Sequence, residues 1–235
     1  MAPAAKKKTS SQTVERTRNV ILGFLGLLVA GFVIGTFYFG SGLSQNSIPQ
    51  PGSDFEVIDG VDMDTPAKVL GVEEYFSYAC IHCKNFDPTL EEWVETLADD
   101  VKFQRKPAAF SRTWSVLAQS YYALEKADAL EGNHEQLFKA IHNGRRNFSS
   151  GQDIADYLDS EELPAAEFMR AFNSRDVSRR LARAASDTQR HSIRAVPTLV
   201  VAGKYRVDIN NGSERALEVV DYLLEKERRM MQEAL

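Results

Sequence analysis

The hydrophobic residues of the chain form strand-like runs on both sides of a long helical pattern. Residues 69–76 combine apolar, aromatic and β-branched side chains and predict a strand, and residues 81–97 follow with helical periodicity. Residues 101–105 alternate as another strand, and residues 55–58 predict a short edge strand. A strand, a helix and a strand in this order predict a β-α-β unit with parallel strands.

The region after Phe110 changes to a helical pattern that continues to about residue 190. Its apolar stripes predict helices that pack around a core of their own. A second interpretation is that these helices also form one wall of a substrate groove beside Cys80.

Strand-like residues return near the C-terminus. Residues 198–202 and 205–208 predict an antiparallel hairpin joined by Gly203-Lys204. Ser213 then predicts the N-cap of an amphipathic helix that continues to about Met231. The helical block therefore separates a β-α-β half of the fold from a β-β-α half.

The N-terminal region predicts a membrane anchor. Val20 to Phe39 contains no charged residue and has the length needed to cross a bilayer as a helix. Residues 1–19 are basic and predict a cytoplasmic segment, while residues 40–54 predict a solvated linker to an exported domain. A cleaved signal peptide is the alternative, although its apolar core would be unusually long.

Composition and charge narrow the class of protein. The chain has 235 residues, of which 43% are hydrophobic, so it can bury one good core or two small ones. The net charge is −5 despite the basic N-terminus, so the part after Gly40 is acidic. This part is expected to have no basic stripe, which argues against a nucleic-acid partner.

The only two cysteines of the chain, Cys80 and Cys83, are separated by two residues at the start of the predicted helix. Unpaired backbone N–H groups and the helix dipole stabilise a thiolate at such a position. No zinc site is predicted, because the remaining candidate ligands, His134, His142 and His191, are scattered. A disulfide that closes a loop of only two residues adds little stability to a fold, so the pair is interpreted as redox-active.

Together these motifs resemble the DsbA family of thiol:disulfide oxidoreductases over about residues 55–230. The resemblance rests on Phe76 to Cys83, on Pro88 within the following helix, on Arg194 to Thr198, and on Gly203 to Tyr205. It implies an α/β thioredoxin-like fold, formed by residues 55–110 and 191–235, with an inserted helical domain at residues 111–190. It also implies a cis peptide bond before Pro197 and no bound cofactor. The dipeptide Ile81-His82 differs from the Pro-His of the best-known members, which leaves the oxidising strength open.

The resemblance implies that the protein introduces disulfide bonds into reduced exported proteins. Cys80 and Cys83 are the predicted catalytic pair, assisted by His82 and Pro197, and Val196 and Ile81 are predicted to bind substrate. No metal site is predicted. The expected location is the bacterial inner membrane, with the catalytic domain in the periplasm and a quinone-linked, DsbB-like membrane protein as reoxidising partner.

Three points stay open on the residues alone. A membrane-tethered reductase or isomerase would share the fold and the motif but have a reducing potential. A peptide-binding or chaperone module would use the groove while the cysteines were incidental. Glu74 matches a buried acid of the family, but either Glu73 or Glu74 could instead be a solvated strand residue, so neither is assigned a role.

Overall fold

The computed structural model describes residues 21–23, 25–32 and 48–234. The chain divides into two compact units, Met1–Ile48 and Pro49–Leu235. In the first unit residues 21–23 and 25–32 are helical and their side chains are exposed. No helix within the described ranges is long and apolar enough to span a bilayer. Much of the anchor predicted at Val20 to Phe39 lies outside these ranges.

The second unit is built on a mixed sheet with the strand order β1-β5-β4-β2-β3. The strands are β1 (Glu56–Val57), β2 (Leu70–Phe76), β3 (Val101–Pro107), β4 (Thr198–Val201) and β5 (Tyr205–Asp208). β2 pairs in parallel with β3 and antiparallel with β4. The predicted parallel β-α-β unit is confirmed, and β2, which lies between β4 and β3, is the strand that leads into the cysteines.

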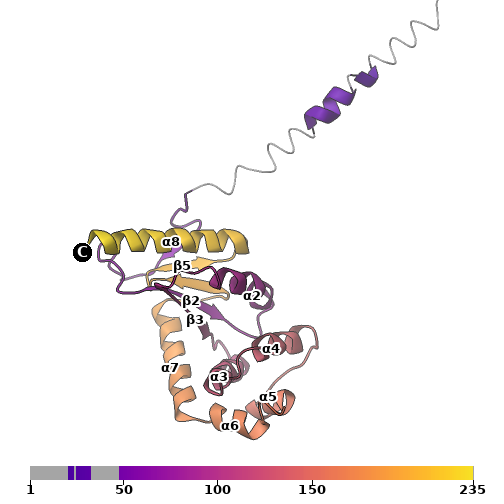
Figure 1. Cartoon of the computed structure of the whole chain (residues 1–235), viewed down its shortest axis with the longest axis vertical. Helices are drawn as coiled ribbons and strands as arrows, with labels where there is room; N and C mark the ends of the chain where they lie inside the picture. Colours follow the sequence, from indigo (N-terminus) through magenta and orange to yellow (C-terminus); the bar gives the residue numbers. More distant parts are fainter. Residues whose placement is uncertain (1–20, 24, 33–47, 235) are drawn as a thin grey trace, which may run out of the picture. The chain divides into compact units, whose positions relative to one another are not determined.

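Two helices pack on the sheet with one shared core. They are α2 (Ile81–Val94), which begins at the cysteine motif, and α8 (Ser213–Glu233), which crosses the sheet at the C-terminus (Figure 1). Their apolar faces meet Val72, Leu199 and Val207 of the sheet in a buried cluster. This cluster anchors α2, so the first turn of α2 is held at the end of β2.

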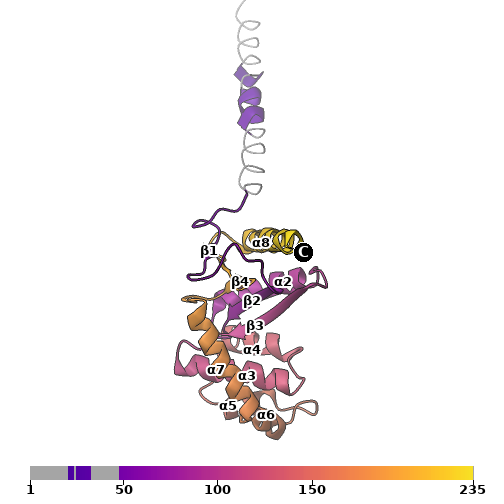
Figure 2. The same ribbon diagram turned by 90° about the vertical axis from the view of Figure 1, so that its left-hand side faces the viewer.

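Five helices between β3 and β4 form a separate helical layer, drawn below the sheet in Figure 2. They are α3 (Arg112–Lys126), α4 (Asn133–His142), α5 (Gly151–Leu158), α6 (Ala165–Phe172) and α7 (Arg175–Arg190). α3 packs against α5, α6 and α7. The core of this layer also includes Phe76, Tyr78 and Cys83, so the helical layer lies directly against the cysteine motif.

The structure corrects two details of the predicted C-terminal half. The hairpin turns at Ala202 and Gly203, whose φ angles are 54° and 68°, rather than at Gly203-Lys204. Lys204 is the last residue of this turn: its backbone N–H donates to the carbonyl of Val201 at 2.9 Å, and its Nζ lies 2.8 Å from Oε2 of the buried Glu227. Ser213 is not an N-cap: α8 begins at this residue, and Gly212 precedes it with no side-chain cap.

A third correction concerns charge. The acidic net charge led to the expectation that no basic stripe exists, but the exposed face of α7 carries Arg175, Arg179, Arg183 and Arg190. A helix turns by about 100° per residue, so these four positions fall within an arc of about 80°. Net charge cannot reveal such a stripe, because it sums over all faces of the domain.

Candidate active site

Cys80 lies between the end of β2 and the start of α2. Its backbone N–H donates to the carbonyl of Ser77 at 3.0 Å, which fixes the turn between strand and helix. Cys80 is the N-cap of α2, and its Sγ accepts the backbone N–H of Cys83 at 3.4 Å. The predicted position at a helix start is confirmed, and the thiol faces unpaired N–H groups of the first turn.

The loop before β4 brings Val196 and Pro197 to the cysteines. The Val196–Pro197 peptide bond is cis, as the resemblance implies. Sγ of Cys80 lies 3.3 Å from the carbonyl oxygen of Val196, to which the sulfur donates when it is protonated. Residues 116 positions apart in sequence therefore meet at one sulfur atom.

The remaining predicted site residues lie at the same helix start. Ile81 is 43% exposed and His82 is also exposed, so both side chains are accessible beside Cys80. Pro197 is buried. All six residues predicted for the site are thus within the region of the α2 start and the loop before β4.

The two thiols have opposite environments. The hydrogen bond from the Cys83 side chain is the largest influence on Cys80 and, with backbone N–H groups of Cys83 and His82, it outweighs partial burial and lowers the pKa of Cys80 to about 6. Cys83 is fully buried, and this burial strongly raises the pKa of its thiol. Cys80 is therefore mostly thiolate at neutral pH, while Cys83 stays protonated.

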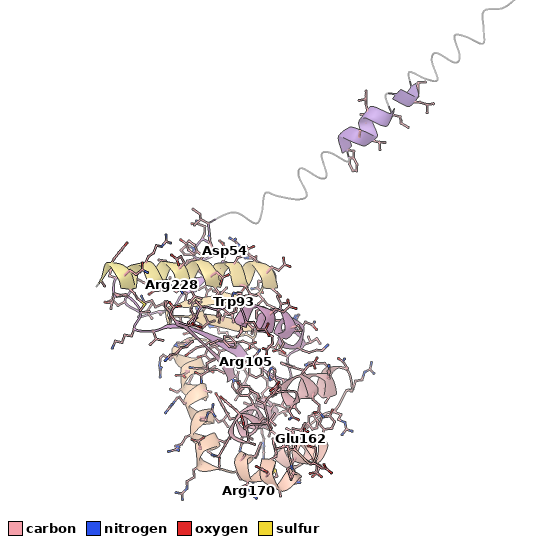
Figure 3. All side chains as sticks on the ribbon, in the orientation of Figure 1. Asp54, Trp93, Arg105, Glu162, Arg170 and Arg228 are labelled. Atoms are coloured by element: carbon pink, nitrogen blue, oxygen red, sulfur yellow. The ribbon has the colours of Figure 1, made fainter. Side chains whose placement is uncertain are left out.

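Behind Cys83 lies a buried network of charged side chains. Arg105 of β3, labelled where the sheet meets the helical layer in Figure 3, lies with Nε 2.9 Å from Oε2 of Glu74 and Nη2 3.0 Å from Oδ1 of Asp87. Glu74 is 1% exposed, and this burial raises the pKa of Glu74 to about 7 although Arg105 opposes the shift. Glu74 is thus a buried acid that changes its charge near neutral pH, not a solvated strand residue.

Two histidines of α4 hold Tyr78, which precedes Cys80 by two residues. Nδ1 of the buried His134 lies 2.8 Å from the hydroxyl of Tyr78, and Nε2 of His142 lies 2.8 Å from the carbonyl oxygen of Tyr78. Nε2 of His134 also lies 3.2 Å from Oδ1 of Asp87. Sequence reasoning considered these histidines only as zinc ligands. His134 and His142 are about two helical turns apart, so both lie on one face of α4. This spacing was the signal that could have indicated a shared contact.

Glu73, next to Glu74 in β2, points into a different cluster. Oε1 of Glu73 lies 2.7 Å from Nζ of Lys106, and Oε2 lies 3.4 Å from Nδ1 of His191. These hydrogen bonds outweigh burial and lower the pKa of Glu73 to about 2. Within the part of the chain that the structure describes, no group of three His, Cys, Asp or Glu side chains is arranged to hold a metal ion.

Comparison with known proteins identifies the family. Residues 71–224, which are more than half of the chain, match the model of the family described as DSBA-like thioredoxin domain. The chain belongs to the DsbA family.

Individual relatives agree with this DsbA assignment. The thiol:disulfide interchange protein DsbA of Pseudomonas aeruginosa is 35% identical over 175 residues, which cover 74% of this chain and 82% of that protein. The DsbA of Pseudomonas syringae pv. tomato is 31% identical over 205 residues, covering 86% and 95% of the two chains.

Solved structures place the fold in the same family. The crystal structure of Pseudomonas aeruginosa DsbA aligns with a TM-score of 0.73 and 33% identity, over 78% of this chain and 97% of that chain. The Xylella fastidiosa DsbA structure aligns with a TM-score of 0.71 at 30% identity, over 78% and 100% of the chains. The thioredoxin-like α/β fold of DsbA is confirmed, and the protein is a thiol:disulfide oxidoreductase.

Proposed function

We propose that this protein introduces disulfide bonds into exported proteins and that Cys80 is the sulfur that exchanges with substrate. The observation that carries the proposal is the contrast between the two thiols. Cys80 is accessible at a helix start and has a pKa lowered to about 6, whereas Cys83 is fully buried. A stable Cys80 thiolate favours the reduced enzyme and hence the donation of its disulfide.

The proposed exchange proceeds in two steps. A substrate thiolate attacks Sγ of Cys80 in the Cys80–Cys83 disulfide, forming a mixed disulfide and releasing Cys83 as a thiolate that takes up a proton. A second substrate thiolate then attacks the substrate sulfur, which forms the substrate disulfide and releases Cys80 as a thiolate. The substrate loses two electrons and the enzyme gains them. A quinone-linked, DsbB-like membrane protein is the proposed partner that removes these electrons.

The neighbouring residues have proposed roles in substrate binding. Ile81 offers an exposed apolar side chain, and the backbone of Val196 faces Cys80 beside the buried Pro197. An extended substrate segment could pair with that backbone while its sulfur meets Cys80. His82, exposed one position further, lowers the pKa of Cys80 through its backbone N–H and, less strongly, its charge.

We also infer that two separate segments of the chain form one thioredoxin-like domain and that a helical domain is inserted between them. Residues 55–110 and 191–235 would form the thioredoxin-like domain, and residues 111–190 the helical domain. Support comes from the separate buried cores of the sheet with α2 and α8 and of the helical layer.

The direction of the reaction is tested by equilibrating the protein with glutathione. Because the Cys80 thiolate stabilises the reduced form, the Cys80/Cys83 pair is expected to be more oxidising than protein disulfide isomerase, whose potential is about −180 mV. Trapping the thiols with a mass tag at each glutathione ratio measures the potential. A value near that of thioredoxin, about −270 mV, would instead support the tethered reductase.

We further propose a single-pass inner-membrane anchor at Val20 to Phe39, with the catalytic domain in the periplasm. Its described part, residues 21–23 and 25–32, is a helix whose large apolar side chains are exposed, for example Leu27 at 73% and Phe32 at 74%. Such a surface requires a partner or a lipid environment.

The anchor predicts a defined topology. A reporter fused after residue 50 is expected to be active only when it works outside the cytoplasm, and the protein should remain in the membrane fraction after alkaline washing. Fractionation with N-terminal sequencing makes the measurement. A soluble product that begins near residue 40 would show that the segment is a cleaved signal peptide.

A further inference from the structure

The arginines of α7 are unusually concentrated for an acidic domain. Between Arg175 and Arg194 the sequence contains six arginines, only two aspartates, and neither lysine nor glutamate. Four of these arginines, Arg175, Arg179, Arg183 and Arg190, form the stripe on the exposed face of α7, which we call the Arg stripe. With a rise of about 1.5 Å per residue, the Arg stripe is about 22 Å long.

The side chains between these arginines are short. Ser178, Ala182, Ala185 and Ser186 are exposed on the same helix, so no large neighbour covers the guanidinium groups. Asp187, one of the two aspartates, is buried and lies 2.6 Å from Nζ of Lys106. The exposed surface of α7 is consequently cationic, with only short side chains between the arginines. This shape suits contact with a broad anionic surface.

The arginines of the stripe are weakly neutralised by the domain itself. Within the described ranges, Arg175 and Arg183 have no acidic partner. Arg179 lies 3.3 Å from Asp176 in a pair whose side chains are 77% and 44% exposed, and such exposed pairs are weak. Arg190 contacts Asp187 yet keeps 66% of its side chain exposed.

The chain that follows the C-terminal end of α7 lies close to the start of the second unit. Arg194, which follows the C-terminal end of α7 and has no ion-pair partner in the described chain, lines one pocket together with Ser53 and Phe55. Ser53 lies near the end of the predicted linker at residues 40–54, which joins the domain to the proposed anchor, and Phe55 directly follows that linker. From there α7 extends away from the sheet to the far end of the helical layer (Figure 2).

We propose that the Arg stripe is a docking surface for anionic phospholipid headgroups, which lays the α7 side of the domain against the membrane. Guanidinium groups bind phosphate oxygens with two parallel hydrogen bonds, and a basic strip near an anionic bilayer is attracted within a Debye length. The acidic remainder of the domain is repelled by the same surface, so charge alone selects one orientation. This proposal goes beyond disulfide exchange and uses the proposed anchor only to bring the domain close to the bilayer.

A membrane surface fits the stripe better than an acidic protein does. The stripe is straight, is flanked by short side chains, and contains no large apolar residue on its exposed face. Protein interfaces usually centre on buried aromatic or apolar anchors, whereas attraction to headgroups needs only charge and a flat approach. An acidic polypeptide partner is therefore the competing outcome of the test.

The test places a fluorescent label in the Arg stripe of the full-length protein. Ser186, which is exposed and lies between Arg183 and Arg190, is replaced by Cys and labelled while the Cys80–Cys83 disulfide keeps the native thiols blocked. The protein is combined with vesicles of phosphatidylcholine, with or without phosphatidylglycerol, that carry a nitroxide quencher on the headgroups. Quenching reports contact of α7 with lipid whether or not the N-terminus is anchored.

Quenching is expected only with anionic vesicles, with at least a tenfold shift in the ratio of contacting to free domains, and 0.5 M salt should abolish it. The variant R175E/R179E/R183E should lose the response. The matched control K68E/K102E/R229E makes the same charge change at exposed positions outside α7 and should keep it. A label at the exposed Gln136 of α4 should not be quenched.

Other results would overturn the proposal. Equal quenching by neutral and anionic vesicles, or full quenching of the charge-reversed variant, would show that the arginines do not direct the contact. A change in label fluorescence on adding polyglutamate, with none on adding anionic vesicles, would assign the stripe to an acidic polypeptide. Oxidation of a reduced test protein, measured in the same samples, separates failure of lipid docking from failure of the proposed oxidase activity.

Discussion

Replacing Cys80 by Ser is expected to abolish the oxidation of a reduced test protein, whereas replacing Cys83 by Ser is expected to trap the enzyme in mixed disulfides. Cys80 is the accessible sulfur with a pKa lowered to about 6, so it forms the bond with substrate. Cys83 is fully buried and its pKa is raised, so it can only resolve a bond made by Cys80. Non-reducing electrophoresis of both variants with substrate makes the measurement.

The matched control for these variants is Asn85→Ser, which introduces a serine at an exposed position of α2 and leaves both sulfurs in place. Its activity is expected to persist. Mixed disulfides formed through Cys83 in the Cys80→Ser protein would contradict the assignment. So would substantial oxidase activity of the Cys80→Ser protein.

The central unit of the fold could be predicted because its signals are local. The strand, the cysteines and the following helix are contiguous, so the pattern of residues 69–97 was sufficient for β2, α2 and the N-cap position of Cys80. The approach of Val196 to Cys80 crosses 116 residues and followed only from the resemblance to a known family. Local pattern alone contains no information on that approach.

The parts that sequence reasoning missed depend on tertiary packing. His134 and Tyr78 are 56 residues apart and meet only because α4 packs on the end of β2. The hairpin connection includes Ala202 as well as the predicted Gly203-Lys204, and Lys204 pairs with Glu227, a side chain of the C-terminal helix that no local pattern links to the hairpin. Glu73 and Glu74 are neighbours, but they face opposite sides of β2, and only the structure shows which charged partner each side offers.

The buried network around Arg105 predicts the largest stability effect in the domain. The Arg105 side chain is 10% exposed and contacts three carboxylates, those of Glu74, Asp87 and Glu91. Arg105→Met would fill similar volume but leave Glu74 and Asp87 buried without their cation. We expect the free energy of unfolding to fall by about 3–5 kcal/mol at pH 8, since breaking a buried pair strands an uncompensated charge.

The loss should depend on pH in a defined direction. In the native protein the pKa of Glu74 is already raised from 4.5 to about 7 by burial, and Arg105 is the main influence that lowers it. Its protonation in the folded state therefore contributes stability that is fully present below about pH 4.5 and is lost as the pH rises through 7. Without Arg105 the pKa of Glu74 must rise further, so Arg105→Met should be much less harmful at pH 5 than at pH 8.

Urea unfolding of the oxidised protein at both pH values tests this expectation, because the disulfide removes the titration of Cys80 from the comparison. Arg228→Met is the matched control: Arg228 also contacts two carboxylates, Asp100 and Glu225, but each is 52% exposed. The free energy of unfolding of Arg228→Met should fall by less than about 1 kcal/mol.

Adding Glu74→Gln to Arg105→Met should restore part of the stability at pH 8 and weaken the pH dependence, because the stranded carboxylate is then neutral. An equal loss for Arg105→Met at pH 5 and pH 8 would show that Arg105 acts through packing and does not compensate a buried charge behind Cys83.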